Sequence, residues 1–181
     1  MYSAGGGRCA VTSPEPVKLF VALLWSDPAS LEEALKRLSR SFGEIDFEGP
    51  DHPFDCTDYY EQEMGVGLHR RLASFAELVP PDSLVEAKER TNEIEDALRT
   101  SGGRRVNVDV GYLDMGKVVL ASTKAAGQKL YMSRGVYADF VCRFQRGRFQ
   151  PFEWTFPDFR DDRYEGELLE IRRRYKGRIT G

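Results

Sequence analysis

The chain has few of the side chains that build metal centres or disulfide frameworks. Among its 181 residues are three cysteines, Cys9, Cys56 and Cys142, and two histidines, His52 and His69. The number of cysteines is odd and no pair has the close spacing of a zinc knuckle. We therefore expect neither a disulfide framework nor a structural zinc site, and the thiols suit the reduced state of a cytoplasmic protein.

Long apolar runs are also absent. The longest, LFVALLW (19–25), is far shorter than the roughly 20 residues that cross a bilayer. The opening stretch, MYSAGGGRCAVTSPEP, has no apolar core of a signal peptide. We expect a cytoplasmic protein with a flexible tail at residues 1–15 and no membrane partner.

The sequence has no excess of positive charge. Lysine and arginine total 26 against 29 aspartate and glutamate residues, a formal charge of −3. This balance disfavours a nucleic-acid partner, because general nucleic-acid binders are usually basic. Two motifs are missing as well. GGGRCAVTS (5–13) lacks the Gly-Lys-Ser/Thr end of a phosphate-binding loop, and Gly-x-Ser-x-Gly does not occur.

The chain does contain enough apolar surface for one domain, since 41% of its residues are hydrophobic. We place that domain at residues 16–176, followed by a short tail at 177–181. The continuously apolar VKLFVALLW (17–25) predicts a buried central strand. Capping-box spacing at Ser30 and Glu33 predicts that a helix follows this strand.

The remaining predicted helices and strands complete the order of elements along the chain. A second helix is predicted at 84–98, and a final amphipathic helix at 164–175. Further strands are predicted at 44–49, 59–64, 68–79, 105–113, 117–124, 129–132 and 136–144, with a hairpin turn at 145–148 leading to an edge strand. The order predicts an α+β fold with a ferredoxin-like β-α-β-β-α-β core. Its largely antiparallel sheet is extended by C-terminal hairpin strands and a C-terminal helix.

Polar side chains with chemical capacity lie in the predicted hairpin of residues 106–126. Asn107 and Asp109 alternate with valines on the first strand, and Ser122 and Lys124 share one face of the second. If the strands turn at 113–116, Asp109 and Lys124 come close on one face. They would form either an exposed ion pair worth about a few tenths of a kcal/mol or part of a site that holds a phosphate or carboxylate.

The second helix carries a polar stripe of its own. Lys88, Asn92 and Glu95 follow one another at i, i+4 and i+7, which places them on one side of the helix. Such a stripe is commonly a solvated face. If it faces the hairpin instead, the two polar sets line one cleft.

A third set combines aromatic and acidic residues. FDCTDYYEQEMG (54–65) contains Asp55, Tyr59, Tyr60 and Glu63, and WTFPDF contains Asp158. Loops of this kind are typical of recognition surfaces, although a small aromatic core with acids facing water would have the same composition. Carboxylates can act as general acid and base or bind Mg²⁺, but no spacing here calls for a metal or a cofactor.

Several blocks together resemble a known family. They include PVKLFVALLWSD, HPFDCTDYYEQEMG, LVEAKERTNEIED, RRVNVDVGYLDMGKVVLASTKAA and FEWTFPDFR. In their order they are similar to the prokaryotic family catalogued as domain of unknown function 4416, over about residues 16–175. The resemblance implies a single domain and no established activity. The positions that match the family include Asp55, Tyr59, Tyr60, Glu63, Lys88, Asn92, Glu95, Asn107, Asp109, Tyr112, Ser122, Lys124 and Asp158.

Two functions remain open from the sequence. In the first, the chain binds or processes a small anionic ligand, such as a phosphorylated one, in a cleft between the second helix and the hairpin. Asp109, Lys124 and Glu95 are then the catalytic candidates, and the other matching positions contact the ligand. In the second, the sheet face and aromatic loops bind a protein or RNA without catalysis. A partly buried pocket that joins Lys88, Asp109 and Lys124 favours the first function, and a flat aromatic face favours the second.

Overall fold

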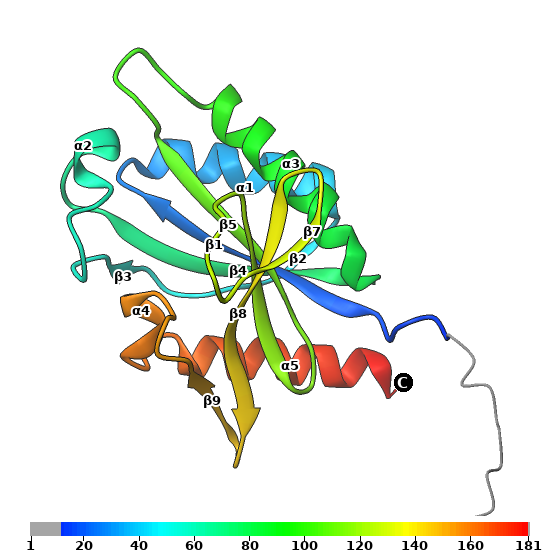
Figure 1. The fold of residues 1–181 in the computed structure, drawn as a ribbon. Coiled ribbons are helices and arrows are strands. Elements are labelled where there is room, and N and C mark those ends of the chain that lie inside the picture. Colours follow the sequence, from blue (N-terminus) through cyan, green and yellow to red (C-terminus); the bar gives the residue numbers. More distant parts are fainter. Residues whose placement is uncertain (1–11, 181) are drawn as a thin grey trace, which may run out of the picture.

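A single sheet organises residues 12–180, which are the part of the chain described by the computed structural model (Figure 1). Its nine strands include the two-residue strand β3, and every pairing between them is antiparallel. The order along the sheet is β2-β4-β1-β5-β6-β8-β7, while β3 pairs with β4 and β9 with β8. The strands are β1 (Val17–Trp25), β2 (Ile45–Glu48), β3 (His52–Pro53), β4 (His69–Val79), β5 (Val106–Leu113), β6 (Lys117–Ser122), β7 (Leu130–Ser133), β8 (Val136–Gln145) and β9 (Arg148–Pro151).

Helices cover both faces of this sheet. The described helices are α1 (Pro28–Phe42), α2 (Glu61–Met64), α3 (Leu84–Ala97), α4 (Pro157–Arg160) and α5 (Glu165–Ile179), with a 3₁₀ turn at Pro81–Ser83. Helices α1 and α3 lie on one face of the sheet and α5 lies on the other (Figure 1), and their apolar side chains pack into the two cores on these faces. The predicted α+β fold with a largely antiparallel sheet is therefore confirmed.

Strand β1 is apolar along its length because both of its faces are covered. Val21 and Leu23 point into the core under α1 and α3, whereas Phe20 and Ala22 point into the core under α5. The exception is Lys18, which is fully buried. Its ammonium donates to Asp46 Oδ2 at 2.7 Å and to the Phe75 carbonyl at 2.6 Å. The predicted central strand is confirmed, with one buried cation satisfied from neighbouring strands.

The start of α1 differs from the prediction. Asp27, not Ser30, is the N-cap residue, and its carboxylate accepts from the backbone N–H groups of Ala29 and Ser30. Pro28 can begin the helix because the first helical residue needs no N–H partner. Glu33 pairs with Arg37 instead of closing a capping box.

Three other predicted boundaries are corrected. Residues 61–64 of the predicted strand 59–64 form the helical turn α2, which Gly65 ends at φ 84. Strand β6 ends at Ser122, so Lys124 lies in the connection to β7. Helix α5 extends through Ile179 into the predicted tail 177–181, and Tyr175 within it is buried.

The N-terminal prediction lies largely outside the described residues, which exclude residues 1–11 and therefore Cys9. Within residues 12–180, no helix has the length and apolar character to cross a membrane. Cys56 and Cys142 are free thiols. Burial raises the pKa of the Cys142 thiol to about 12, with Asp162 adding to the effect, so this cysteine behaves as a small apolar residue.

Candidate functional site

The sheet separates between β5 and β6, and this separation creates the site. The two strands pair only where Gly111–Leu113 meets Val118–Leu120. Gly111 permits this contact, since a Cβ there would lie 2.4 Å from the Val119 carbonyl oxygen. Toward Val106 the outer edge of β5 has no strand partner in the described sheet.

Two buried side chains of α3 take the place of that missing partner. Lys88 Nζ donates to the Val108 carbonyl at 3.3 Å, and Glu95 Oε1 accepts from the Val108 N–H at 2.8 Å. Both backbone polar groups of Val108 are thus satisfied although β6 has turned away. The predicted polar stripe of α3 is therefore not a solvated face at these two positions, which are 8% and 7% exposed.

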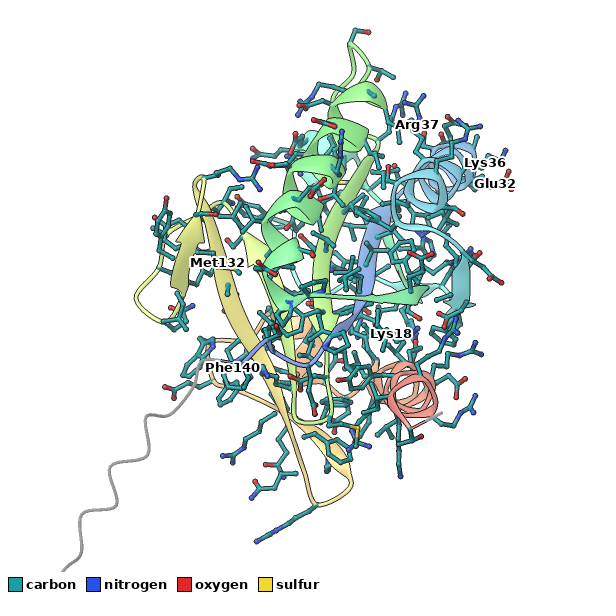
Figure 2. The ribbon with its side chains drawn as sticks, turned by 90° about the vertical axis from the view of Figure 1, so that its right-hand side faces the viewer. Lys18, Glu32, Lys36, Arg37, Met132 and Phe140 are labelled. Atoms are coloured by element: carbon teal, nitrogen blue, oxygen red, sulfur yellow. The ribbon has the colours of Figure 1, made fainter. Side chains whose placement is uncertain are left out.

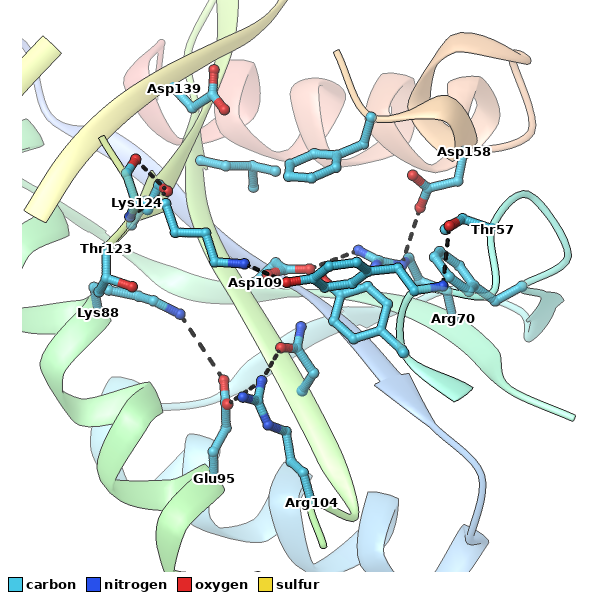
Figure 3. Close-up of a pocket in the computed structure, with 18 of the residues that line it drawn as sticks. Thr57, Arg70, Lys88, Glu95, Arg104, Asp109, Thr123, Lys124, Asp139 and Asp158 are labelled. Carbon is cyan, nitrogen blue, oxygen red and sulfur yellow. Dashed lines mark hydrogen bonds and ion pairs between the residues drawn. The ribbon is translucent and has the colours of Figure 1, made fainter. Parts of the chain in front are cut away.

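A cavity of about 530 Å³ occupies the space between the separated strands (Figure 3). Its wall comes from the β3–α2 loop, α2, β4, α3, β5, β6, β8 and the start of α4. This volume lies within the range of small-molecule sites in proteins. Segments far apart in the sequence therefore converge on one concave surface.

Arg70 of β4 is the central cation of the cavity wall. Its Nη1 lies 2.9 Å from Asp109 Oδ2, and its Nε lies 3.1 Å from Asp158 Oδ2. The ring of Phe54 packs 5.0 Å from the guanidinium carbon. Burial lowers the pKa of Arg70, but Asp158 and Asp109 outweigh this effect and raise it above the usual value. The guanidinium stays charged and ties β4, β5 and α4 together.

A second ionic cluster lies beside α3. Arg104 contacts Glu95 Oε2 at 3.1 Å, Glu63 Oε1 at 3.2 Å and Asn107 Oδ1 at 2.5 Å. Lys88 Nζ lies 4.0 Å from Glu95 Oε1. Burial raises the pKa of Glu95, although Lys88, the Val108 N–H and Arg104 all act in the opposite direction.

The opposite wall carries two lysines in different settings. Lys129 Nζ contacts Asp139 Oδ2 at 3.3 Å and donates to Ser122 Oγ at 2.9 Å. Lys124 Nζ donates to the hydroxyl of Tyr59 at 2.7 Å and lies 5.0 Å from the centre of its ring. Within residues 12–180, no carboxylate oxygen approaches Lys124 Nζ within the 4.0 Å of an ion pair.

Most of the predicted site residues line this one cavity. They are Tyr59, Tyr60, Glu63, Lys88, Asn92, Glu95, Asn107, Asp109, Ser122, Lys124 and Asp158. Asp55 does not; it is exposed and pairs with Arg163 at 2.9 Å. Tyr112 is buried in the core beneath α1 and α3, because it continues the alternation of the β5 valines.

The predicted proximity of Asp109 and Lys124 does not produce an ion pair. Asp109 binds Arg70, and Lys124 binds Tyr59. The physical reason is the end of β6 at Ser122, which places Lys124 in the connection to β7 that lines the cavity.

Other residues of the wall were not predicted from the sequence. They include Phe54, Thr57, Arg70, Arg104, Lys129 and Asp139. A signal existed for Arg70. It stands two and four residues before the buried Leu72 and Ser74 of β4, so it lies on the same face of the strand and points into the protein. Three polar atoms of lining residues are buried without a hydrogen bond: Arg70 Nε, which still forms the ion pair with Asp158, Asn107 Nδ2 and Asp139 Oδ1.

No group of three or more His, Cys, Asp or Glu residues suited to a metal ion occurs in the described part of the chain. A model of the family described as Domain of unknown function (DUF4416) matches residues 15–175. This match spans most of the chain and confirms the resemblance of the sequence blocks. Comparisons with curated proteins and with solved structures gave no match.

Proposed function

Since the chain belongs to the family described as Domain of unknown function (DUF4416), whose description names no activity, we propose a function from its cavity. The protein binds a small anionic ligand between α3 and the hairpin of residues 107–124. The observation that carries the proposal is that Lys88, Asp109 and Lys124 line one cavity of about 530 Å³ and not a flat face. Concave sites with a few convergent polar groups are the usual setting for small ligands.

Lys124 is the residue that would hold the anionic group. It is the lysine of the cavity wall whose ammonium has a neutral partner, the Tyr59 hydroxyl, in place of a carboxylate. Lys88 lines the same cavity, and its ammonium donates to the Val108 carbonyl and lies 4.0 Å from Glu95 Oε1. Tyr59 and Tyr60 supply aromatic surface at the mouth, where their rings meet edge to face.

If the ligand is also processed, Asp109 is the better placed general base. Its side chain is 22% exposed and only one of its oxygens contacts Arg70. Glu95 is held by the Val108 N–H and by Arg104, so its role is to stabilise the cavity wall. General-base catalysis requires a carboxylate that can approach the ligand's proton.

Ligand-induced stabilisation in a thermal-shift assay tests the proposal. The screen contains phosphate monoesters, nucleotides and small carboxylates, and a ligand at 100 times its Kd raises stability by about 2.7 kcal/mol. For a chain of this size that corresponds to a Tm increase of roughly 5–10 °C. Lys124→Met should abolish the shift.

The matched control for this variant is Lys36→Met. Lys36 is exposed on the outer side of α1 and is not part of the cavity wall (Figure 2). It should leave ligand-induced stabilisation unchanged. A shift that survives Lys124→Met, or the absence of any hit in the screen, would count against the proposal.

A second candidate function, binding of a protein or RNA partner, has a specific observation in its favour. Phe140, Trp154 and Phe156 are 37–44% exposed, and the rings of Phe152 and Trp154 stack with centroids 4.8 Å apart. Aromatic side chains of this kind are enriched at recognition surfaces. Trp154→Ala should weaken a partner complex without altering the response to small anions.

Two finer features also belong to this proposal. The core is ferredoxin-like, supported by the strand order β2-β4-β1-β5 with α1 and α3 in the two connections on one face. The protein is cytoplasmic, supported by the free thiols of Cys56 and Cys142.

A further inference from the structure

Around Arg70, the positive and negative charges of the cavity wall do not sum to zero. Arg70 is a single guanidinium that serves two carboxylates, Asp109 at 2.9 Å and Asp158 at 3.1 Å. One positive charge cannot neutralise two negative charges. The side chain of Asp158 is 2% exposed, whereas that of Asp109 is 22% exposed. The uncompensated negative charge therefore reaches the cavity at Asp109.

At the neighbouring clusters the charges do balance. Lys88, Arg99 and Arg104 face three carboxylates, Glu63, Glu95 and Asp96. On the opposite wall Lys129 faces Asp139 in a one-to-one pair. These groups thus leave the excess at Asp109 unchanged.

The positive excess lies at Lys124. In the described part of the chain its ammonium has no carboxylate within ion-pair distance, and it donates to the neutral hydroxyl of Tyr59. Tyr59 itself is 63% exposed and belongs to the loop before α2. Its hydroxyl oxygen, 2.7 Å from Nζ, occupies the position that an oxygen of a bound anion would take.

A separate observation is that some polar atoms of cavity-lining residues have no hydrogen-bond partner. Besides Arg70 Nε, which lies 3.1 Å from Asp158 Oδ2, the atoms Asp139 Oδ1 and Asn107 Nδ2 are buried without a hydrogen bond, and these two residues are only 5% and 6% exposed. Buried polar atoms are rarely left unpaired in proteins. One is an acceptor and the other a donor, which is consistent with a ligand that carries both kinds of group.

We infer that the cavity takes a zwitterionic ligand, with an anionic group on Lys124 and an ammonium group on Asp109. This inference rests on the proposed function and names the chemistry of its ligand. An uncharged ligand would leave both excess charges without partners. A ligand with two anionic ends would bring one of them against Asp109, where like charges repel.

Four probes that differ only in charge and length test the inference. They are 2-aminoethyl phosphate with ethyl phosphate as its matched control, and 3-aminopropyl phosphate with propyl phosphate. Binding to the whole chain is followed by changes in backbone amide NMR signals, which also locate the probe. At least one amino probe should bind roughly tenfold or more tightly than its alkyl control, as a charge-assisted hydrogen bond provides.

Two variants assign the charges. Asp109→Asn should remove the advantage of the amino probe and leave alkyl phosphate binding intact, while Lys124→Met should weaken both. Asp82→Asn is the matched control, because Asp82 is exposed in the 3₁₀ turn and is not part of the cavity wall. The comparison of amino and alkyl probes on the unaltered protein stands even if Asp109→Asn fails to fold.

The outcomes separate the two proposals. Equal binding of amino and alkyl phosphates, lost in Lys124→Met, would overturn the zwitterion and leave anion binding in place. If none of the four probes moves the signals of residues 107–109 or 122–124, the proposed function fails together with the inference. Tighter binding of an amino probe that persists in Asp109→Asn would show that another carboxylate takes the ammonium, and would overturn the assignment.

Discussion

Replacing Arg70 with methionine should destabilise the protein strongly, because the substitution removes the charge but retains much of the side-chain volume. Arg70 is 4% exposed and lies between Asp109 and Asp158. In Arg70→Met, Asp158 becomes a buried carboxylate whose remaining contact is the hydroxyl of Tyr164, at 3.1 Å. Breaking a buried ion pair by removing one partner costs about 3–5 kcal/mol. We therefore expect Tm to fall by roughly 6–20 °C.

The neighbouring arginine provides a matched control. Arg71 lies on the same strand and also faces two carboxylates, Asp51 and Glu48, but its side chain is 23% exposed. Pairs of this kind contribute about 0–1 kcal/mol because water and salt screen them. Urea unfolding of Arg70→Met and Arg71→Met, at equal pH and salt, should thus separate the two by several-fold in lost stability.

A double variant tests the physical cause. Asp158→Asn removes the buried charge that Arg70→Met leaves alone, so the two substitutions together should destabilise by less than the sum of each. Additive losses would show that Arg70 acts through packing and not through charge. A loss in Arg70→Met no larger than that in Arg71→Met would refute the reasoning altogether.

Three further results are expected. Tyr59→Phe removes the hydroxyl that occupies Lys124, so ethyl phosphate should bind at least as tightly as to the parent; weaker binding in an NMR titration would contradict this. Gly111→Ala places a Cβ 2.4 Å from a carbonyl oxygen and should cost about 1–3 kcal/mol in urea unfolding; an unchanged midpoint would exclude such a clash. Hydrogen bonds from Arg173 and Arg174 hold the pKa of Glu170 at about 2, below the ordinary value. Its contribution, about 0–1 kcal/mol, is present near pH 7 and fades as pH falls from about 5 to 2. Glu170→Gln should therefore lose more stability at pH 7 than at pH 2, and a loss independent of pH would contradict the pairing.

The sequence predicts best the features that depend on neighbours in the chain. The apolar run of β1 and the helical spacing in α3 reflect burial on a regular element, so their positions follow from periodicity alone. Asp27 was missed because Ser30 and Glu33 imitate a cap one turn later. Asp27 and Ser30 are both local N-cap signals, and Pro28 favours Asp27 because proline is suited to the first helical position.

The site depends on contacts between segments that are far apart in the sequence, and local sequence patterns do not reveal such contacts. Lys88 and Glu95 have the spacing of a solvated stripe, and only the divergence of β6 from β5 places them against a strand edge. Arg70 lies on a strand whose overall alternation is poor, and its spacing from Leu72 and Ser74 is the one local signal that it points inward. Its carboxylate partners are distant in sequence, and Asp158 comes from the other end of the chain.

The hydrogen bonds that Lys88 and Glu95 of α3 form with Val108 also keep the cavity open without a ligand. Because Lys88 and Glu95 occupy both polar groups of Val108, β6 cannot extend its pairing along β5 without displacing two buried charges. The cavity is therefore open before any ligand arrives, and a ligand need not separate strands to enter. Such preorganisation lowers the entropy that binding must overcome, and an anion that binds Lys124 replaces the hydrogen bond to the Tyr59 hydroxyl.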